Sequence, residues 1–322
     1  MGRKLLFVFR WGVFLLACAF LHAQLTTVKG TAALEAFRRM RENGLFPIVL
    51  LVTVLLMVVN WSIESRKWRW LMLPVERIGA GRSLLATVAG TSVGLITPNR
   101  TGEFLGRVLF LEPHHRVQGG FATALGSVAQ FVITLVMGGL GLLALYGLGR
   151  PFPWTSGWVT TAILSLTVLV STGALALYLH PGLLRQLLLL IPFLHRAERA
   201  SAVLNAYEPE RLYGVLALSA LRYVVFTGQF VLLLTTFDPG LSVVDAACAV
   251  PVIYLVSTLI PTVMITELGI RGTAAVSLLV PLGGEEVPVL FATAILWSIN
   301  VVLPAMVGSV ILLMARVRTN NA

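Results

Sequence analysis

One polar signature occurs twice in this otherwise apolar chain. Residues 97–107 read T-P-N-R-T-G-E-F-L-G-R, and residues 261–271 read P-T-V-M-I-T-E-L-G-I-R. Each copy has a Pro, then a Glu, and an Arg four residues after the Glu. The two Glu are 164 residues apart (267 − 103), and so are the two Arg (271 − 107). A repeated Glu/Arg pair in apolar sequence indicates a polar site built from two related halves, a pattern typical of transport proteins.

The spacing inside each copy predicts an ion pair. Residues four apart share one face of a helix, so Glu103 can pair with Arg107 and Glu267 with Arg271. An isolated Arg at the middle of a membrane costs about 3 kcal/mol or more, so we expect these groups to face a protein-lined or watery cavity. Backbone N–H groups freed at the preceding proline breaks favour an anion such as phosphate, and the arginines supply counter-charge.

A purely structural interpretation is that the pairs neutralise each other and pin two half-helices together, or that charges near the membrane surface snorkel. Further polar residues in neighbouring apolar runs, including Asn60 and Glu64, favour a polar interior instead. Arg222 and Gln229 are two helical turns apart and share a face. The candidate substrate-binding residues are Asn99, Arg100, Glu103, Arg107, Gln130, Arg222, Gln229, Glu267 and Arg271.

Composition places the chain among integral membrane proteins. Of its 322 residues 57% are hydrophobic and 12% charged, with a mean hydropathy of +0.89, whereas soluble domains carry about a quarter charged residues. The length leaves room for roughly eight membrane segments of about 20 residues. We therefore predict one all-α, polytopic transmembrane domain over residues 1–322.

Apolar runs predict two kinds of segment. Full spans are expected near residues 5–24, 45–63, 118–147, 155–179, 212–236 and 288–314. Residues 83–97 and 243–260 are instead interrupted, at Pro98 and Pro261, and each resumes as a helix that carries the Glu. Such broken segments at corresponding places predict re-entrant hairpins or discontinuous helices. The first span could alternatively be a signal peptide cleaved after Ala23.

The repeat extends beyond the motif. A shift of 164 residues carries the span that starts at 45 to 209, and the span that starts at 118 to 282. The repeat units are thus about 45–147 and 212–314, each a helix, a broken re-entrant pair and a helix. One span, 155–179, lies between them, so the second unit enters the membrane from the opposite side. The sequence predicts an inverted repeat.

Basic residues predict the orientation. With the N-terminus inside, sixteen Lys and Arg fall in cytoplasmic segments and five on the other side, which the positive-inside rule favours. Both termini are then cytoplasmic. Residues 31–43 contain a basic cluster on the outer side and predict an amphipathic surface helix. The net charge of +10 is spread over short loops, so we expect no nucleic-acid partner.

Residues 60–70, N-W-S-I-E-S-R-K-W-R-W, predict either an aromatic belt with basic anchors or a site that gathers anionic lipid headgroups. The two interpretations are compatible. The candidate headgroup-gathering residues are Glu64, Arg66, Lys67 and Trp68.

No cofactor or metal pattern is evident. Cys18 and Cys248 lie in apolar runs without a ligand partner nearby, and the adjacent His114 and His115 lack zinc-type spacing. The chain also has no Asp-rich metal motif and no nucleophile with an oriented base. We therefore expect no metal site, no cofactor and no enzymatic activity.

The motifs T-P-N-R-T-G-E-F-L-G-R, P-T-V-M-I-T-E-L-G-I-R-G and N-W-S-I-E-S-R-K-W resemble the flippase-like transmembrane domain of lysylphosphatidylglycerol synthases and its stand-alone relatives. The resemblance covers nearly the whole chain. It implies a bacterial inner-membrane protein that moves a lipid or lipid-linked substrate between leaflets. Glu103 and Arg107 fall on the family's Gly-Glu...Arg element, and Glu267 and Arg271 on its second broken-helix element. Because few residues follow Arg316, we expect no aminoacyl transfer by this chain.

The expected function is transbilayer translocation of an anionic phospholipid or lipid-linked substrate. Two other classes stay open: a membrane enzyme acting on phospholipids or polyprenyl-linked sugars, and a non-transporting scaffold for a lipid- or glycan-modifying enzyme. Membrane lipid is the expected partner, with such an enzyme and a second copy of the chain as further candidates. Gly138, Gly139 and Gly141 allow close helix packing, within one chain or between chains.

Overall fold

The computed structural model describes residues 44–95, 97, 100–150, 157–190, 197–260 and 264–314, with 264 and 265 described for their backbone only. The described residues form helices and no β-strand, as predicted. The α-helices are α3 (Phe46–Met72), α4 (Ala80–Leu95), α5 (Gly102–Val108), α6 (Arg116–Gly147), α7 (Gly157–Leu179), α8 (Pro181–Leu189), α9 (Glu198–Ser201), α10 (Pro209–Phe237), α11 (Val243–Leu259), α12 (Met264–Leu279), α13 (Glu286–Trp297) and α14 (Leu303–Met314). Short 3₁₀ turns lie at Pro113–His115, Ala202–Ala206 and Val280–Leu282, and a π-helical turn, Ser298–Val302, joins α13 to α14.

Five helical stretches among the described residues are long and apolar enough to cross a membrane: Phe46–Met72, Pro113–Gly147, Gly157–Leu179, Pro209–Phe237 and Glu286–Met314. They confirm five of the predicted spans and the polytopic fold. The predicted span 5–24 and surface helix 31–43 lie outside the described residues.

The first of these helices continues well past the predicted end of its span. We placed that end at residue 63, where charged residues begin, but α3 runs on to Met72. Its charged residues remain helical because Glu64 and Lys67 are three residues apart and form a buried ion pair.

Apolar packing divides into two main clusters. The larger joins α6, α10, α11, α12 and α13, and includes Phe230, Ile253 and Leu296. The second joins α3, α6 and the segment before α10, and includes Trp68. In the second cluster the Tyr207 hydroxyl donates to the Leu71 carbonyl at 2.6 Å, and burial raises the pKa of Tyr207, so the proton stays in place.

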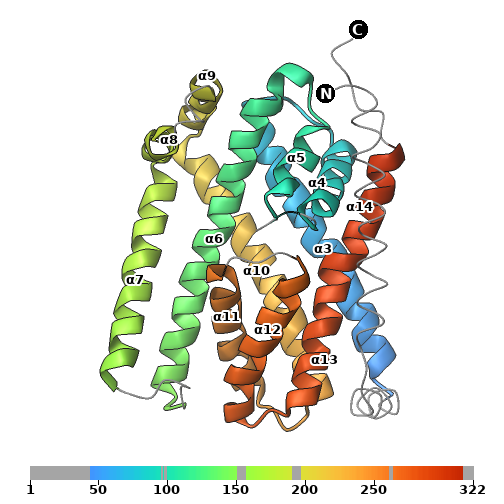
Figure 1. Ribbon diagram of the computed structural model, residues 1–322, viewed down its shortest axis with the longest axis vertical. Coiled ribbons are helices and arrows are strands. Elements are labelled where there is room, and N and C mark those ends of the chain that lie inside the picture. Colours follow the sequence, from blue (N-terminus) through green and yellow to red (C-terminus); the bar gives the residue numbers. More distant parts are fainter. Residues whose placement is uncertain are drawn as a thin grey trace.

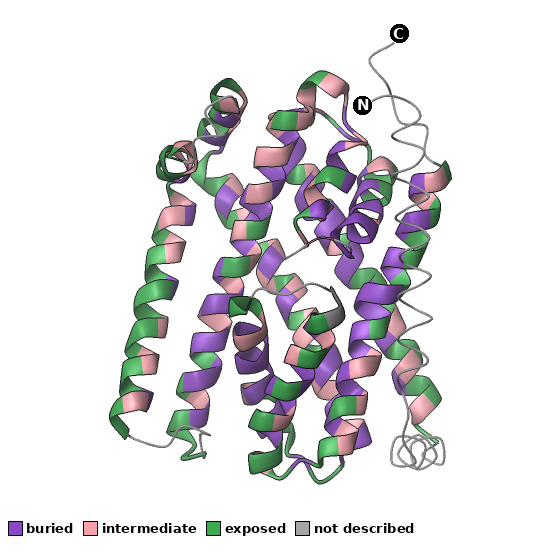
Figure 2. Cartoon of the chain, viewed as in Figure 1, coloured by how far each residue is buried: buried purple, intermediate pink, exposed green. Residues whose placement is uncertain are grey.

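The exposed side chains are distributed as expected for a membrane protein. Leucines on the outer faces of the long helices are exposed, and α7 buries few residues, among them Tyr178. Figure 2 shows the exposed residues along the outer edges of the molecule and the buried ones towards its centre. Exposed apolar side chains along such long helices suit lipid contact.

Two helical hairpins approach each other from opposite ends of the molecule (Figure 1). Helices α4 and α5 lie towards one end and α11 and α12 towards the other. The predicted interruptions are therefore confirmed as breaks between helices, α4 ending at Leu95 and α11 at Leu259. Pro98 and Pro261 themselves lie outside the described residues, and re-entry into a membrane stays a prediction.

Small residues set the spacing inside the first hairpin. A Cβ on Gly106 would lie 2.6 Å from Cα of Gly90, and a Cβ on Gly94 would overlap the side chain of Glu103. Glycine at these positions lets α4 and α5 approach backbone to backbone. The close approach holds Glu103 and Arg107 against α4.

The glycines of α6 pack within the chain. A Cβ on Gly138 would lie 2.6 Å from Cβ of Leu255, and one on Gly141 would lie 2.7 Å from the Cys248 carbonyl oxygen. Both contacts are with α11. Gly139 faces Thr167 of α7 instead. These glycines therefore seat α11 and α7 on α6 in one protomer.

The order of elements repeats with the predicted offset. A shift of 164 residues carries α3 (46–72) to 210–236, one residue inside each bound of α10, and carries α4 (80–95) to 244–259, which ends with α11. Each half is a long helix, a hairpin and a long helical stretch, and α7 lies between the halves in the sequence. In the fold, α7 lies at the edge of the molecule beside α6 (Figure 1). The order agrees with the proposed repeat units, and inverted symmetry between them stays a prediction.

Candidate functional site

A cavity of about 540 Å³ lies where the two hairpins meet. The C-terminal ends of α4 and α11 contribute Leu95 and Thr258, and further walls come from α3, α5, α6, α10, α12 and the π-helical turn. The volume falls within the range of about 300–1,000 Å³ usual for small-molecule sites. Its charged lining comprises the carboxylates Glu64, Glu103 and Glu267 and the basic side chains Lys67, Arg100, Arg107, Arg222 and Arg271.

The first charged network is centred on Glu64 of α3. Its carboxylate binds Lys67 at 2.7 Å, Arg107 at 2.8 Å and Arg222 at 3.0 Å. Arg107 also pairs with Glu103 at 3.0 Å, which confirms the predicted ion pair along one turn of α5. Three basic and two acidic side chains give this network a formal charge of +1. It holds α3, α5 and α10 together.

The second charged network is centred on Glu267, in the first turn of α12. Arg271 donates to this carboxylate at 2.9 Å, which confirms the second predicted pair. Arg100, on the connection between α4 and α5, donates from Nη2 to both carboxylate oxygens at 2.8 and 2.9 Å. Two basic side chains and one carboxylate again give a formal charge of +1. Arg100 therefore links the first hairpin to the second.

The backbone at Arg100 adopts a left-handed conformation. Its φ is +56°, whereas side-chain-bearing residues favour negative φ. Residues on either side of Arg100 are joined by a hydrogen bond, in which the Thr97 hydroxyl accepts from the Gly102 N–H at 2.7 Å. This local geometry lets the Arg100 side chain reach Glu267.

Neighbouring groups orient Arg222. Its Nε donates to Asn60 at 2.9 Å, and its guanidinium lies 5.5 Å from the centre of the Trp61 ring. Asn60 in turn makes a long contact of 3.5 Å with Asn300, on the π-helical turn. Neither Trp61 nor Asn300 was among the residues predicted for the site. Asn300 is a single Asn within an apolar run, and this isolation is the sequence feature that could have indicated a role in the site.

Arg271 lies in a more aromatic setting. Its guanidinium lies 5.8 Å from the centre of the Phe226 ring and 5.6 Å from that of Tyr254. Nε and Nη1 of Arg271 are buried and find no hydrogen-bond acceptor in the part of the chain that the structure describes. Rings offer a buried cation only partial compensation for lost water. Arg271 thus keeps hydrogen-bonding capacity in reserve.

Most of the predicted substrate-binding residues line this cavity: Arg100, Glu103, Arg107, Gln130, Arg222, Glu267 and Arg271. Gln229 does not belong to the lining. Its amide donates to the Thr53 carbonyl at 2.7 Å, so it fastens α10 to α3 although it shares a helix with Arg222. Asn99 lies outside the described residues.

The four residues predicted to gather headgroups are divided by the structure. Glu64 and Lys67 are buried in the first network, and Trp68 is fully buried, with its indole N–H donating to Thr123 at 2.9 Å. Only Arg66 is exposed. Helical periodicity explains the division, because positions 64, 67 and 68 lie on the inward face of α3. Trp68 is therefore a core residue and not part of an interfacial belt.

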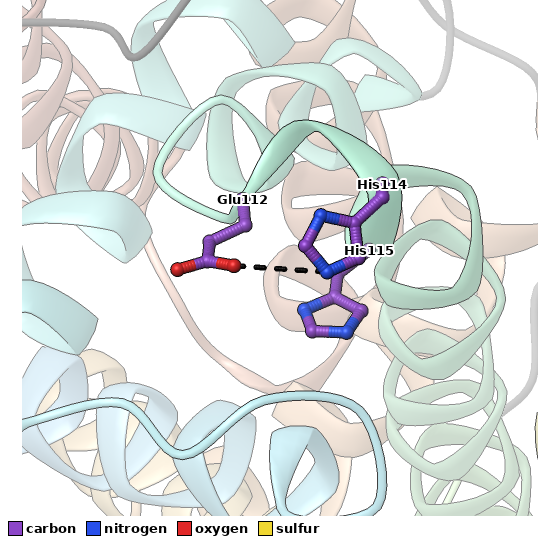
Figure 3. A group of neighbouring side chains, drawn as sticks. All are labelled: Glu112, His114 and His115. Carbon is purple, nitrogen blue, oxygen red and sulfur yellow. Dashed lines mark ion pairs between the residues drawn. The ribbon is translucent and has the colours of Figure 1, made fainter. Parts of the chain in front are cut away.

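A separate cluster of titratable side chains lies beside the start of α6. Ligand-type atoms of Glu112, His114 and His115 come within 4.8 Å of one another, and none of these residues lines the cavity. Figure 3 shows the Glu112 carboxylate directed at His114, an ion pair of 3.7 Å when the imidazole is protonated. Imidazoles and a carboxylate can bind a transition metal, an arrangement that the sequence analysis did not predict.

Glu76 connects this cluster of Glu112, His114 and His115 to the hairpin of α4 and α5. Its Oε2 accepts from the Glu112 backbone N–H at 2.9 Å and lies 3.3 Å from Nδ1 of His115, while Oε1 lies 3.4 Å from Arg82. Arg82 also donates to the Phe110 carbonyl. The carboxylate thus ties the connection after α3 to the connection before α6, which steadies the first hairpin.

Comparison with known proteins agrees with this architecture. A family model described as the lysylphosphatidylglycerol synthase TM region matches residues 5–315. No curated protein and no solved structure matches the chain. With nearly its whole length matched, the chain belongs to the family of lysylphosphatidylglycerol synthase transmembrane regions, membrane domains associated with lipid handling.

Proposed function

We propose that this protein moves an anionic phospholipid or lipid-linked substrate from one leaflet of the membrane to the other through the cavity between the hairpins. The observation that carries the proposal is the charge of that cavity. Its five basic and three acidic side chains give a formal excess of two positive charges in a largely buried site. An anionic headgroup would supply the missing counter-charge.

A purely structural role explains these residues less well. Pinning two half-helices requires matched pairs, whereas each network here has one basic side chain more than carboxylates. Ionisable residues inside membrane proteins are costly and usually mark a substrate or ion pathway. The excess positive charge is therefore better explained by binding of a ligand than by packing alone.

The hairpins supply the moving parts of the proposed mechanism. Headgroup contact with Arg107, Arg222 and Arg271 would hold the polar end of the substrate in the cavity while its acyl chains stay in lipid. Rocking of the two halves would then open the cavity to each side in turn. The Glu residues hold the arginines in place or take up protons as coupling sites.

Orientation enters the proposal through the basic connections. The last turn of α3 and the connection that follows it contain Arg69 and Arg77, and α9 contains Arg199. The C-terminal end of α3 and α9 lie at the same end of the molecule (Figure 1). The positive-inside rule assigns that end to the cytoplasm of a bacterial inner membrane. Cytoplasmic termini are part of the same proposal.

The direct test is movement of labelled lipid between leaflets. Purified protein in liposomes would be scored with fluorescent anionic and zwitterionic lipids, comparing the unmodified chain with the Arg107→Gln/Arg271→Gln double variant. Arg199→Gln is the matched control, because Arg199 is exposed on α9 and outside the cavity. We expect movement of the anionic lipid to be lost in the double variant and kept in the control.

Other outcomes would favour the alternatives. Normal movement in the double variant would contradict a path through the cavity. Absence of movement for every lipid, together with a partner protein that co-purifies in stoichiometric amount, would favour a scaffold for a lipid- or glycan-modifying enzyme. Turnover of a labelled lipid in detergent, where leaflets no longer exist, would favour an enzyme.

A further inference from the structure

The excess positive charge is divided evenly between two networks. The network around Glu64 has a formal charge of +1, and so has the network around Glu267. Both line the same cavity. A single site for one negative charge would need only one of them.

The carboxylates of the two networks have little capacity left. Glu64 already binds three basic side chains, and Glu267 accepts from two arginines through both of its oxygens. Arg271 nevertheless keeps Nε and Nη1 without an acceptor among the described residues. Buried donors left in this state are unfavourable until a ligand supplies acceptor oxygens.

Headgroup chemistry determines how much of this charge a lipid can neutralise. A phosphodiester headgroup brings one negative charge, so it would neutralise one network and leave the other with an uncompensated buried charge. A terminal phosphomonoester carries about −1.5 to −2 at pH 7 and three acceptor oxygens. A diphosphate brings at least as much charge over a longer span. Such a group can engage both networks together.

We infer that the preferred substrate is a lipid whose headgroup ends in a doubly charged phosphate, a phosphomonoester or a diphosphate, bound between Arg107 of the first network and Arg271 of the second. The lipid part of this inference rests on the proposed function. The charge preference is a property of the cavity and is measurable by binding alone.

The binding experiment compares two lipids that differ by one charge. Full-length protein in detergent at pH 7 is titrated with dihexanoyl phosphatidate and with dihexanoyl phosphatidylethanol, which has the same phosphate and chains but an esterified oxygen. Isothermal calorimetry gives both dissociation constants. We expect phosphatidate to bind about tenfold tighter or more, the effect of one further charge-assisted contact. Equal affinities would overturn the inference.

Three variants locate the preference in the networks. Arg107→Gln and Arg271→Gln each remove the excess charge of one network, so the ratio of the two affinities should fall towards one. Glu103→Gln raises the charge of the first network and should increase the ratio. Arg199→Gln should leave the ratio unchanged. Each variant is first checked for a single peak in gel filtration and for cooperative thermal unfolding, and a ratio that is insensitive to both arginines in folded protein would contradict the assignment.

Inorganic phosphate and liposome assays separate the remaining outcomes. If inorganic phosphate binds as tightly as dihexanoyl phosphatidate, the cavity recognises free phosphate and the lipid assignment is wrong. If phosphatidate binds preferentially but does not cross the bilayer in liposomes, the charge preference is supported and translocation is contradicted. If phosphatidate and phosphatidylethanol cross equally, with dependence on both arginines, translocation is supported and the charge preference is overturned.

Discussion

The two hairpins contain the same Glu/Arg pair at the same spacing, yet each pair makes different contacts. Arg107 of α5 is held by two carboxylates, Glu103 and Glu64, whereas Arg271 of α12 is held by one. The Glu of the second pair is shared instead with Arg100 from the first hairpin. The repeat therefore provides a common frame. The asymmetry gives the first pair an additional anchoring role and leaves Arg271 of the second pair with more unpaired donors for a ligand.

Removing the shared anchor should have the largest effect. Glu64→Gln leaves the buried Lys67 and Arg107 and the partly buried Arg222 with Glu103 as the remaining carboxylate of their network. Removing one partner of a buried ion pair costs about 3–5 kcal/mol. We expect a large fall in the thermal unfolding temperature in detergent and in the yield of folded protein. The exposed Glu210→Gln is the matched control, and equal unfolding temperatures for the two variants would refute an anchoring role for Glu64.

The two arginines should contribute unequally to stability although both are needed for lipid movement. Arg107→Gln leaves Glu103 without its ion-pair partner and removes one of the three basic partners of Glu64, so it should destabilise the fold by about 3 kcal/mol. Arg271→Gln leaves Glu267 paired with Arg100 and should cost about 1 kcal/mol. Both should abolish lipid movement in liposomes. Chemical denaturation in mixed micelles measures the stability difference. Equal destabilisation by the two changes would mean that the hairpins are equivalent after all.

A pair of glycine substitutions tests the packing difference between the hairpins. Gly94→Ala places a methyl group on the Glu103 side chain, and overpacking of this kind costs about 1–3 kcal/mol. Gly269, next to the second pair, has open space around its added Cβ. Gly269→Ala should be stabilising by about 0.5–1 kcal/mol, because it removes a helical glycine. Thermal unfolding of both variants checks the opposite signs, and destabilisation by Gly269→Ala alone would contradict this account.

Cutting the link between the hairpins should have the smallest effect on stability. The Arg100 side chain is 36% exposed, so Arg100→Gln should cost at most about 1 kcal/mol. The cavity should nevertheless open more often. Thr91 lines the cavity and is buried, so it can report the opening. Thr91→Cys, in a background with Cys18 and Cys248 changed to Ala, then reacts faster with a maleimide when Arg100 is also changed to Gln. An unchanged labelling rate would show that the Arg100 ion pair does not restrain the hairpins.

Sequence reasoning reached the helices and the two local ion pairs because their signals are local. Apolar length predicts spans, proline predicts breaks, and i,i+4 spacing predicts Glu103 with Arg107 and Glu267 with Arg271. Contacts between residues far apart in the sequence have no local spacing pattern that could predict them. The ion pair between Arg100 and Glu267 joins residues that only tertiary packing brings together.

Two further features show where the sequence signal was present but ambiguous. Trp68 in a basic, aromatic segment suited a membrane interface as well as a core, and only the packing of α3 places it inside. The small-residue pattern Gly90-x-x-x-Gly94 with Gly102-x-x-x-Gly106 was readable as a close helix contact, and it is the contact inside the first hairpin.

The central claim is that a charged headgroup crosses through the cavity and contacts both networks. The most direct measurement is the initial rate at which labelled phosphatidate appears in the outer leaflet of liposomes containing the unmodified protein, Arg271→Gln or Arg199→Gln. We predict movement for the unmodified chain and Arg199→Gln, and a rate at the level of protein-free liposomes for Arg271→Gln. Movement by Arg271→Gln at the rate of the unmodified chain would contradict the account.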